Sequence, residues 1–397
     1  MPLPQTDAIV AKTLHLSHFA RRLVESTPDL KNDLAAKLDS PWSAEEMLAA
    51  LTAAAIADEN ALKKTLRRLR QRVMLRLIAR DLGGLADLRE VMATASLLAE
   101  TTLRFALAQL DGWLRVQYGT PLGEDSGSAQ DLIVVGMGKL GGFELNVSSD
   151  IDLIFAYPEE GQTSGARVIS NHEYFSLLGK KLIQALNENT EDGFVFRVDM
   201  RLRPYGDSGP LVASFAMLEE YYLTQGREWE RYAWIKGRPL VGSCHEELTA
   251  LLRPFVFRKY LDFGAFASMR DLHGQIRREV ARRDMSDNIK LGPGGIREIE
   301  FITQVFQLIR GGKDAALQTR STLVALEVLE QRQLLPTQAV NELREAYFFL
   351  RNLEHRLQYL DDAQTQTLPA NAADQQLIAE AMGYAGYPKF LAALDKT

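Results

Sequence analysis

Cysteine, long apolar runs and an excess of positive charge are all scarce or missing in this sequence. Its single cysteine, Cys244, excludes an intramolecular disulfide and a cluster of thiolate metal ligands. No apolar run approaches the roughly 20 residues of a membrane span, and the amino terminus lacks the apolar core of a signal peptide. A formal net charge of -6 argues against a general nucleic-acid surface. We therefore expect a cytoplasmic protein that binds no membrane and no nucleic acid.

Helical patterns dominate both ends of the chain, and strand patterns are confined to the middle. Residues 1–120 are rich in Leu, Ala, Arg and Glu at helical spacing, which predicts a helical amino-terminal region. Residues 120–129 carry Pro and Gly and indicate a polar linker. Strand signals then define a core over residues 130–212. Apolar spacing in segments such as 341–360 predicts a helical bundle over residues 213–397, and the length leaves room for two or three domains.

The core combines two apolar strands, a helix and a third strand. Residues 132–135 and 151–157 are apolar at nearly every position, which predicts buried strands. Residues 173–187 carry the apolar stripe of a helix. Residues 193–202 alternate in strand fashion. A small sheet with helices, flanked by helical regions on both sides, predicts an α+β fold.

Three aspartates fall on these strands. Asp150 and Asp152 stand one residue apart, directly after a glycine-rich turn. Alternate residues of a strand project from one face, so the two side chains lie about 6 to 7 Å apart along it. Asp199 adds a carboxylate in the middle of the third strand, on the same face as Arg201 and Arg203. A lone aspartate would more simply cap a helix or solubilise a strand edge, but three that converge imply a bound cation such as Mg²⁺, because buried unpaired carboxylates are costly.

The order of these elements resembles the polymerase-β-like nucleotidyltransferase core, and longer motifs narrow the resemblance. Residues 136–155, 197–212 and 288–301 closely resemble the family of bifunctional glutamine synthetase adenylyltransferase/adenylyl-removing enzymes. The resemblance runs from about residue 15 to the end of the chain. That family has two related nucleotidyltransferase halves, whereas this chain has one Asp-x-Asp block of this kind. Its motifs resemble the amino-terminal, adenylyl-removing half, so we expect a fragment that lacks the adenylylating activity.

The resemblance implies a reaction and its components. The substrate would be an AMP group on a tyrosine of glutamine synthetase, and inorganic phosphate would release it as ADP, which regulates nitrogen assimilation. Asp150, Asp152 and Asp199 would be the catalytic residues and the metal ligands, with two Mg²⁺ ions expected and Mn²⁺ as the other option. Adenylylated glutamine synthetase, the uridylylated PII signalling protein, phosphate and ADP would be the partners.

Other residues are candidates for binding the nucleotide and the phosphate: Gly138, Lys139, Ser149, Arg201, Arg203 and Lys290. Lys139 and Ser149 would contact phosphate oxygens, and the other cationic side chains would grip the incoming phosphate. Lys290 lies beside the glycine-rich loop 292–295, which opens a helix and so offers backbone N–H groups to an anion. The same loop could instead be a tight packing turn.

The segment 227–232 predicts a helix with paired charges on its surface. Trp229 or Tyr232 on this helix is an alternative candidate for lining a nucleotide pocket.

Three other functions stay open. Adenylyl transfer from ATP would use the same metal geometry, so the aspartates do not fix the direction of transfer. Residues 136–141 match the G-x-G-x-x-G dinucleotide fingerprint, with Glu159 or Glu160 near the expected ribose-binding position, which keeps an NAD-binding oxidoreductase open. Against it, residues 139–149 hold weak helix formers where a helix would be needed. The chain could also be a non-catalytic module that binds partners, although such a module would not need the three aspartates.

Overall fold

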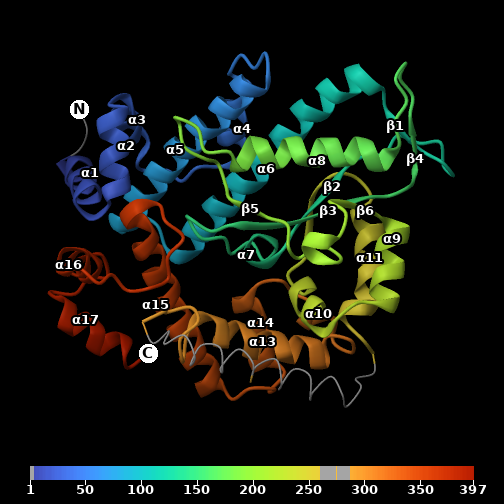
Figure 1. The fold of residues 1–397 in the computed structure, drawn as a ribbon. Coiled ribbons are helices and arrows are strands. Elements are labelled where there is room, and N and C mark those ends of the chain that lie inside the picture. Colours follow the sequence, from blue (N-terminus) through green and yellow to red (C-terminus); the bar gives the residue numbers. More distant parts are fainter. Residues whose placement is uncertain (1–3, 260–273, 275–286) are drawn as a thin grey trace.

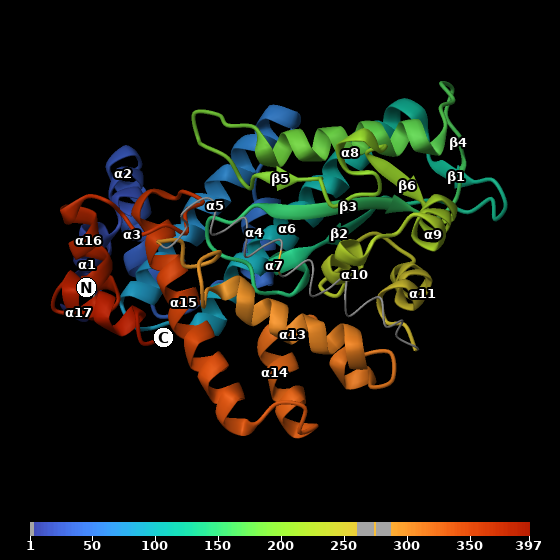
Figure 2. The ribbon, with the colours of Figure 1, turned by 60° about the horizontal axis from the view of Figure 1, so that its bottom comes forward.

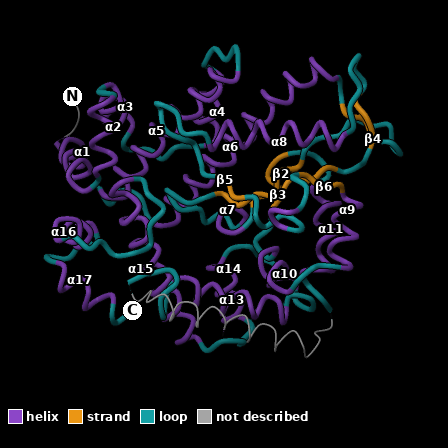
Figure 3. The backbone as a smooth tube through the Cα atoms, viewed as in Figure 1, coloured by secondary structure: helices purple, strands orange, loops and turns teal. Residues whose placement is uncertain are grey.

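The computed structural model of this chain describes residues 4–259, 274 and 287–397. Figure 1 shows a sheet at the centre, long helices of the amino-terminal half over one side of it, and the orange and red helices of the carboxyl-terminal part on the other side. Figure 3 shows most of the strands in the middle of the molecule and a short two-stranded ribbon at its edge. The α+β composition predicted from the sequence is therefore confirmed.

Six helices form the amino-terminal region: α1 (Pro4–Leu16), α2 (His18–Ser26), α3 (Asp29–Lys37), α4 (Ala44–Thr52), α5 (Glu59–Leu82) and α6 (Leu88–Tyr118). Most of them begin where a Ser or Asp side chain accepts a hydrogen bond from a backbone N–H of the first turn, as Asp58 does for α5 and Asp87 for α6. The two longest helices pack their apolar faces against each other and against the sheet in one shared core.

Helix α6 is the one helix in the described part of the chain that is long and apolar enough, by length and composition alone, to cross a membrane. In this fold 67% of its most apolar window is buried. It packs in the same core as the sheet, which is the environment of an ordinary core helix.

The central sheet has the strand order β5-β3-β2-β7, with β6 also paired to β3. Its strands are β2 (Ile133–Gly136), β3 (Ile151–Tyr157), β5 (Val198–Asp199), β6 (Val212–Ser214) and β7 (Arg238–Val241). Strand β3 is antiparallel to β2 and parallel to β5 and β6. Successive residues of β3 enter different cores, since Phe155 packs with the amino-terminal helices and Ile154 packs on the opposite face.

Shorter elements complete the middle of the chain. They are the helices α7 (Gly138–Gly141), α8 (Asn171–Asn187), α9 (Phe215–Thr224), α10 (Glu228–Trp234) and α11 (His245–Val256), the 3₁₀ turn η1 (Gly206–Ser208), and a two-stranded ribbon of β1 (Pro121–Gly123) and β4 (Gly161–Thr163). Strand β1 of this ribbon lies within residues 120–129, which the sequence indicates as a polar linker. Likewise, β7 extends the sheet beyond the 130–212 range predicted for the core.

The first two predicted strands and the helix between β4 and β5 are confirmed within two residues, but the third predicted strand is wrong over most of its length. Residues 193–202 contribute only the two residues of β5, because the flanking backbone bonds elsewhere. Gly193 closes a turn with Thr190, and the N–H of Phe196 donates to the carbonyl of Leu186 at the end of α8. After the strand, the N–H of Arg201 donates to the side chain of Asp199 at 2.8 Å.

The antiparallel pairing of β2 with β3 excludes the Rossmann alternative. A dinucleotide-binding unit needs two parallel strands joined by a helix. Here the connection holds only the four residues of α7 followed by a loop.

The carboxyl-terminal region consists of α13 (Ile296–Arg310), η2 (Ala315–Leu317), α14 (Thr322–Gln331), α15 (Thr337–Asp361), α16 (Ala372–Ala381) and α17 (Tyr387–Leu394). The helix predicted over 341–360 is confirmed as the central part of α15. Figure 2 shows α13 to α15 below the sheet; α16 packs against α1, and α17 packs against α16. Hydrogen bonds join the two ends of the chain, including one from the Ser17 hydroxyl to the carbonyl of Tyr359 at 2.5 Å. Residues 260–273 and 275–286 of the predicted bundle lie outside the described residues.

Candidate active site

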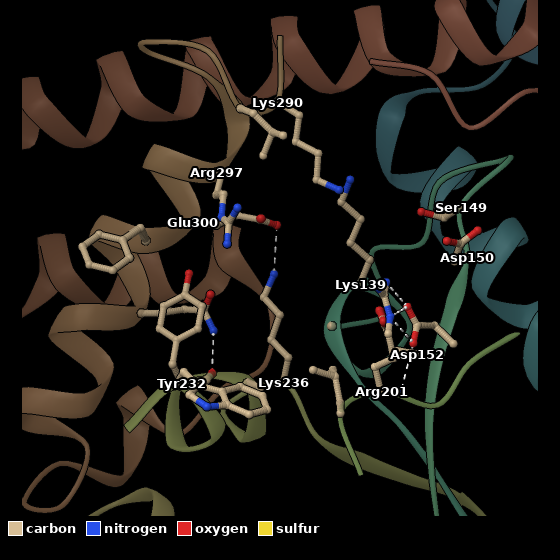
Figure 4. Close-up of a pocket in the computed structure, with 18 of the residues that line it drawn as sticks. Lys139, Ser149, Asp150, Asp152, Arg201, Tyr232, Lys236, Lys290, Arg297 and Glu300 are labelled. Carbon is tan, nitrogen blue, oxygen red and sulfur yellow. Dashed lines mark hydrogen bonds and ion pairs between the residues drawn. The ribbon is translucent and has the colours of Figure 1, made fainter. Parts of the chain in front are cut away.

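A cavity of about 530 Å³ lies between one end of the sheet and the helices α10 and α13 (Figure 4). One wall comes from the turn around α7 and from β3 and β5. The opposite wall comes from α10 and the turn after it, and from α13 and the loop before it. The lining residues are Gly138, Lys139, Ser149, Asp150, Asp152, Asp199, Arg201, Leu202, Trp229, Tyr232, Ala233, Lys236, Lys290, Leu291, Arg297, Glu300, Phe301, Gln304 and Gln364.

The aspartates lie where the sheet opens into this cavity. Asp152 and Asp199 are direct neighbours in the parallel pairing of β3 with β5, and Asp150 stands immediately before β3. Burial raises the pKa of Asp152 to about 6, and the negative charges of Asp199 and Asp150 add to this shift. The adjacent turn favours glycine at position 138. Gly138 has a positive φ of 53°, and an added Cβ would stand only 3.0 Å from a carboxylate oxygen of Asp152.

Two arginines hold the other carboxylates. Arg201 Nε lies 3.0 and 2.9 Å from the two oxygens of Asp199, and the resulting hydrogen bonds lower the pKa of that carboxyl. Arg197 Nε donates to Asp150 at 2.7 Å. Among the described residues, no three or more His, Cys, Asp or Glu side chains are grouped as a ready metal site. The structure brings the three aspartates together in the lining of one cavity, with Asp152 and Asp199 as neighbours on adjacent strands.

Lys236 is the cation on the wall opposite the aspartates (Figure 4). Its ammonium lies 3.0 Å from a carboxylate oxygen of Glu144, 3.2 Å from Glu300 and 3.0 Å from the Thr322 hydroxyl. Burial alone would lower the pKa of Lys236, but the two carboxylates raise it, so the side chain stays charged. Burial would raise the pKa of Glu300, but the positive charges of Lys236, Lys139 and Arg351 lower it to about 2.

Lys139 has a different environment. Its ammonium lies 3.0 and 2.9 Å from the two carboxylate oxygens of Glu354, a residue of α15 that is fully buried. Burial lowers the pKa of Lys139 to about 7, with Glu354 opposing the shift and Arg351 and Lys290 adding to it. Lys139 thus joins the glycine turn to the carboxyl-terminal helices as well as lining the cavity.

The far end of the cavity is aromatic. The rings of Tyr232 and Phe301 lie 5.8 Å apart and inclined by 33°, and Gln304 donates to the carbonyl of Tyr232 at 3.2 Å. Trp229 stands beside them with 38% of its surface exposed. Flat rings next to an amide are a surface on which a planar heterocycle can stack.

The cavity brings together all but one of the residues predicted from the sequence. Arg203 is absent from its lining, because its guanidinium turns back to donate to the carbonyl of Met200 at 2.7 Å. The sequence interpretation missed Lys236 and four residues of α13, namely Arg297, Glu300, Phe301 and Gln304. Those four fall at helical spacing on one face, and a polar and aromatic face on an otherwise apolar helix is the signal that could have found them.

Comparison with known proteins assigns the chain to a family. The family model for glutamate-ammonia ligase adenylyltransferase matches residues 8–253, more than half of the chain. The chain belongs to this family. A second family model, for GlnD PII-uridylyltransferase, matches residues 270–397 of the chain.

Several curated relatives are similar to this chain over most of its length. A bifunctional glutamine synthetase adenylyltransferase/adenylyl-removing enzyme of Chromobacterium violaceum is 60% identical over 98% of this chain and 44% of the relative. The proteins of the same name from Nitrosomonas europaea and from Neisseria meningitidis serogroup B are 58% and 54% identical, over 98% and 85% of this chain and 42% and 38% of the relatives. The chain thus spans less than half the length of these relatives. The resemblance to this family that the sequence motifs indicate is confirmed.

Proposed function

We propose that this chain is the amino-terminal, adenylyl-removing half of such a bifunctional enzyme and that it removes AMP from glutamine synthetase by phosphorolysis. An oxygen of inorganic phosphate forms a bond to the phosphorus of the AMP group. The bond from that phosphorus to the tyrosine oxygen breaks, so ADP leaves and the tyrosine oxygen takes up a proton. The proposal also assigns residues 130–212 to a polymerase-β-like catalytic core, extended by β7, between the helical regions 1–120 and 213–397.

The observation that carries the proposal is the adjacency of Asp152 and Asp199 on β3 and β5, with Lys236 and Lys290 lining the same cavity. Two anionic reactants must come together in this reaction, and carboxylates alone would repel both. Phosphoryl transfer depends mainly on positioning and on neutralising charge, and it needs no covalent nucleophile from the protein. A cavity that combines carboxylates with ammonium and guanidinium groups suits that requirement.

Asp150, Asp152 and Asp199 would hold the metal, two Mg²⁺ ions in the proposal or Mn²⁺ in their place. These residues fit a hard cation, because they supply only oxygen donors and because burial, together with the negative charges of Asp199 and Asp150, raises the pKa of Asp152. When bound, the ions would stabilise charge on the attacking and leaving oxygens.

The remaining residues of the cavity would position the reactants. Lys236 and Lys290 would hold the incoming phosphate through their ammonium groups. Arg201 would release Asp199 and turn to a phosphate oxygen, since 74% of its side chain is exposed and little packing restrains it. Gly138 would let a phosphate approach the backbone of the turn, and Ser149 would donate its hydroxyl to a phosphate oxygen. Trp229 and Tyr232 would stack on the adenine ring.

The proposed partners follow from the family. Adenylylated glutamine synthetase would be the substrate, and the uridylylated PII protein would be a regulator. The reaction would take place in the cytoplasm. The match to the GlnD PII-uridylyltransferase model over residues 270–397 supports a link to PII. Adenylyl transfer from ATP is the second candidate function. It is supported by the names of the relatives, which give both adenylyl transfer and adenylyl removal.

Incubation of the chain with adenylylated glutamine synthetase, Mg²⁺ and ³²P-labelled phosphate tests the proposal. We expect labelled ADP, and no labelled ADP with Asp152→Asn. Unlabelled AMP would indicate hydrolysis, and labelling of unmodified glutamine synthetase from α-³²P-ATP would indicate transfer in the opposite direction. Absence of both products, with glutamine synthetase still bound, would indicate a non-catalytic binding module.

A further inference from the structure

A second, smaller cavity of about 90 Å³ lies behind the wall that carries Lys236. Its walls come from the end of α10, the start of β7, helix α11 and the loop between η2 and α14. The lining residues are Trp234, Ile235, Gly237, Pro239, Leu248, Thr249, Leu252, Arg253, Val256, Phe257, Gln318 and Arg320. No part of the proposed reaction uses this cavity.

Most of the wall is apolar and firmly held. Trp234 is nearly buried, and its indole N–H donates to the hydroxyl of Tyr222 at 2.7 Å. The ring lies so close to Gly237 that an added Cβ there would stand 2.4 Å from it. Leu248 and Leu252 of α11 are buried in the same core as this ring. The cavity is therefore a preformed space with a rigid apolar floor.

Arg320 is a charged residue in this wall. It is partly buried, and its Nε donates to the carbonyl of Gly237 at 2.7 Å. Among the described residues, no carboxylate forms an ion pair with this guanidinium. Burial lowers the pKa of Arg320, and the nearby positive charge of Arg238 lowers it further. Arg238 already has a partner, since it donates to Glu100 at 2.5 Å.

A partly buried guanidinium without a counter-charge, next to a second one, favours an added anion. Arg253 brings a further positive charge to the same cavity, on the exposed side of α11. The volume limits the guest to a few heavy atoms. We propose that this cavity is a binding site for a small organic anion, a carboxylate on a short apolar chain, with the carboxylate on Arg320 and the chain against Trp234 and Leu252.

The site shares a wall with the larger cavity. Within the segment 232–237, Tyr232, Ala233 and Lys236 line the large cavity, and Trp234, Ile235 and Gly237 line the small one. Arg320 donates to the carbonyl of Gly237, which directly follows Lys236 in the chain. An anion bound to Arg320 would thus lie close to the segment that carries Lys236. This placement makes the site a candidate for regulating the binding of phosphate by Lys236.

Titration calorimetry with butyrate as the probe tests the binding site directly and does not depend on the enzymatic activity. A ligand of this size should bind wild-type protein with a Kd of about 1 to 10 mM. The neutral isostere butyramide should bind roughly tenfold or more weakly, because it lacks the charge that Arg320 recognises. Thermal unfolding with and without butyrate gives a second readout, since a ligand of the folded state raises the midpoint.

Three variants make the test specific. Arg320→Gln keeps a donor for the Gly237 carbonyl and should lose butyrate binding roughly tenfold or more. Arg253→Gln, at an exposed position, should fold normally and weaken binding by a smaller factor. Arg89→Gln is the matched control, because its side chain is 65% exposed and lies outside the cavity. Unsaturable binding by the wild type, equal binding of butyramide, or unchanged affinity in both Arg320→Gln and Arg253→Gln would each overturn the proposal.

Discussion

Lys236 and Glu144 form an ion pair at 3.0 Å with 6% and 3% of their side chains exposed. Glu144 belongs to the loop between α7 and β3, and Lys236 lies between α10 and β7, so the pair joins the loop that leads to the aspartates with the opposite wall. The second oxygen of Glu144 accepts from the N–H of Thr322 at 2.7 Å and from the Ser321 hydroxyl at 3.0 Å, at the start of α14. One carboxylate thus fixes three segments around the cavity.

The first prediction concerns this carboxylate. Glu144→Gln keeps an oxygen for Thr322 but removes the charge beside Lys236, leaving Glu300 as its remaining anion. Loss of one partner of a buried ion pair costs about 3 to 5 kcal/mol, and the remaining carboxylate should hold the loss near the lower figure. Urea unfolding measures it. The exposed pair of Arg332 with Asp314 supplies the control, since Arg332→Gln should cost less than about 1 kcal/mol. Equal losses in the two variants would contradict the structural role of Glu144.

Asp152→Asn separates function from stability. In EDTA at pH 8 this variant should be as stable as the wild type or more stable by about 1 to 3 kcal/mol, because burial and the neighbouring carboxylates disfavour the ionised Asp152 in the folded state. Mg²⁺ should raise the unfolding temperature of the wild type and leave that of the variant unchanged. Scanning calorimetry with and without Mg²⁺ gives both results. An equal Mg²⁺ shift in the two proteins would remove Asp152 from the metal site.

Local patterns predicted the elements that carry the site better than they predicted how those elements meet. The apolar run 151–157 predicts a buried strand, and it forms β3 over the same residues. Its side chains are apolar on both faces because they pack into two cores. The extent of β5 could not be predicted, because it depends on bonds from Phe196 to α8 and from Arg201 to the Asp199 side chain. Lys236 could not be predicted either. A single lysine near Gly237 gains its place through Glu144, Glu300 and Thr322, which are distant in sequence.

Arg201 and Arg203 form a matched pair two residues apart, and they should behave differently. Arg201→Gln removes a cation that lines the cavity and should reduce turnover roughly tenfold to a hundredfold with little change in stability, since the side chain is largely exposed. Arg203→Gln removes a bond to the Met200 carbonyl and should mainly lower stability, by about 1 kcal/mol. Phosphorolysis rates and urea unfolding on the same samples separate the two effects. A larger loss of turnover in Arg203→Gln than in Arg201→Gln would show that the guanidinium groups rearrange when substrate binds.

The pair of Lys139 with Glu354 gives a stability effect that depends on pH. Glu354→Gln leaves Lys139 buried among positive charges from Arg351 and Lys290, with only the more distant Glu300 to offset them, so the pKa of Lys139 should fall below its present value of about 7. The unfolded lysine keeps a pKa near 10.5, and the folded protein therefore releases a proton at lower pH than the unfolded chain does. Stability then rises with pH above the folded pKa, because the unfolded state binds more protons there. Below that pKa the folded variant must hold an uncompensated buried charge.

We therefore expect Glu354→Gln to be less stable than the wild type by about 2 to 4 kcal/mol at pH 6 and by clearly less at pH 9, where Lys139 is neutral in both folded proteins. Urea unfolding at the two pH values measures the difference. The double variant Lys139→Met with Glu354→Gln removes the titrating group, so its own stability should lack the rise between pH 6 and pH 9 that Lys139 gives the wild type and Glu354→Gln. A single-variant deficit that stays constant over this range, or that grows at high pH, would show that the pKa of Lys139 does not fall when Glu354 is lost, and would contradict the role of Glu354 in holding the charge of this lysine.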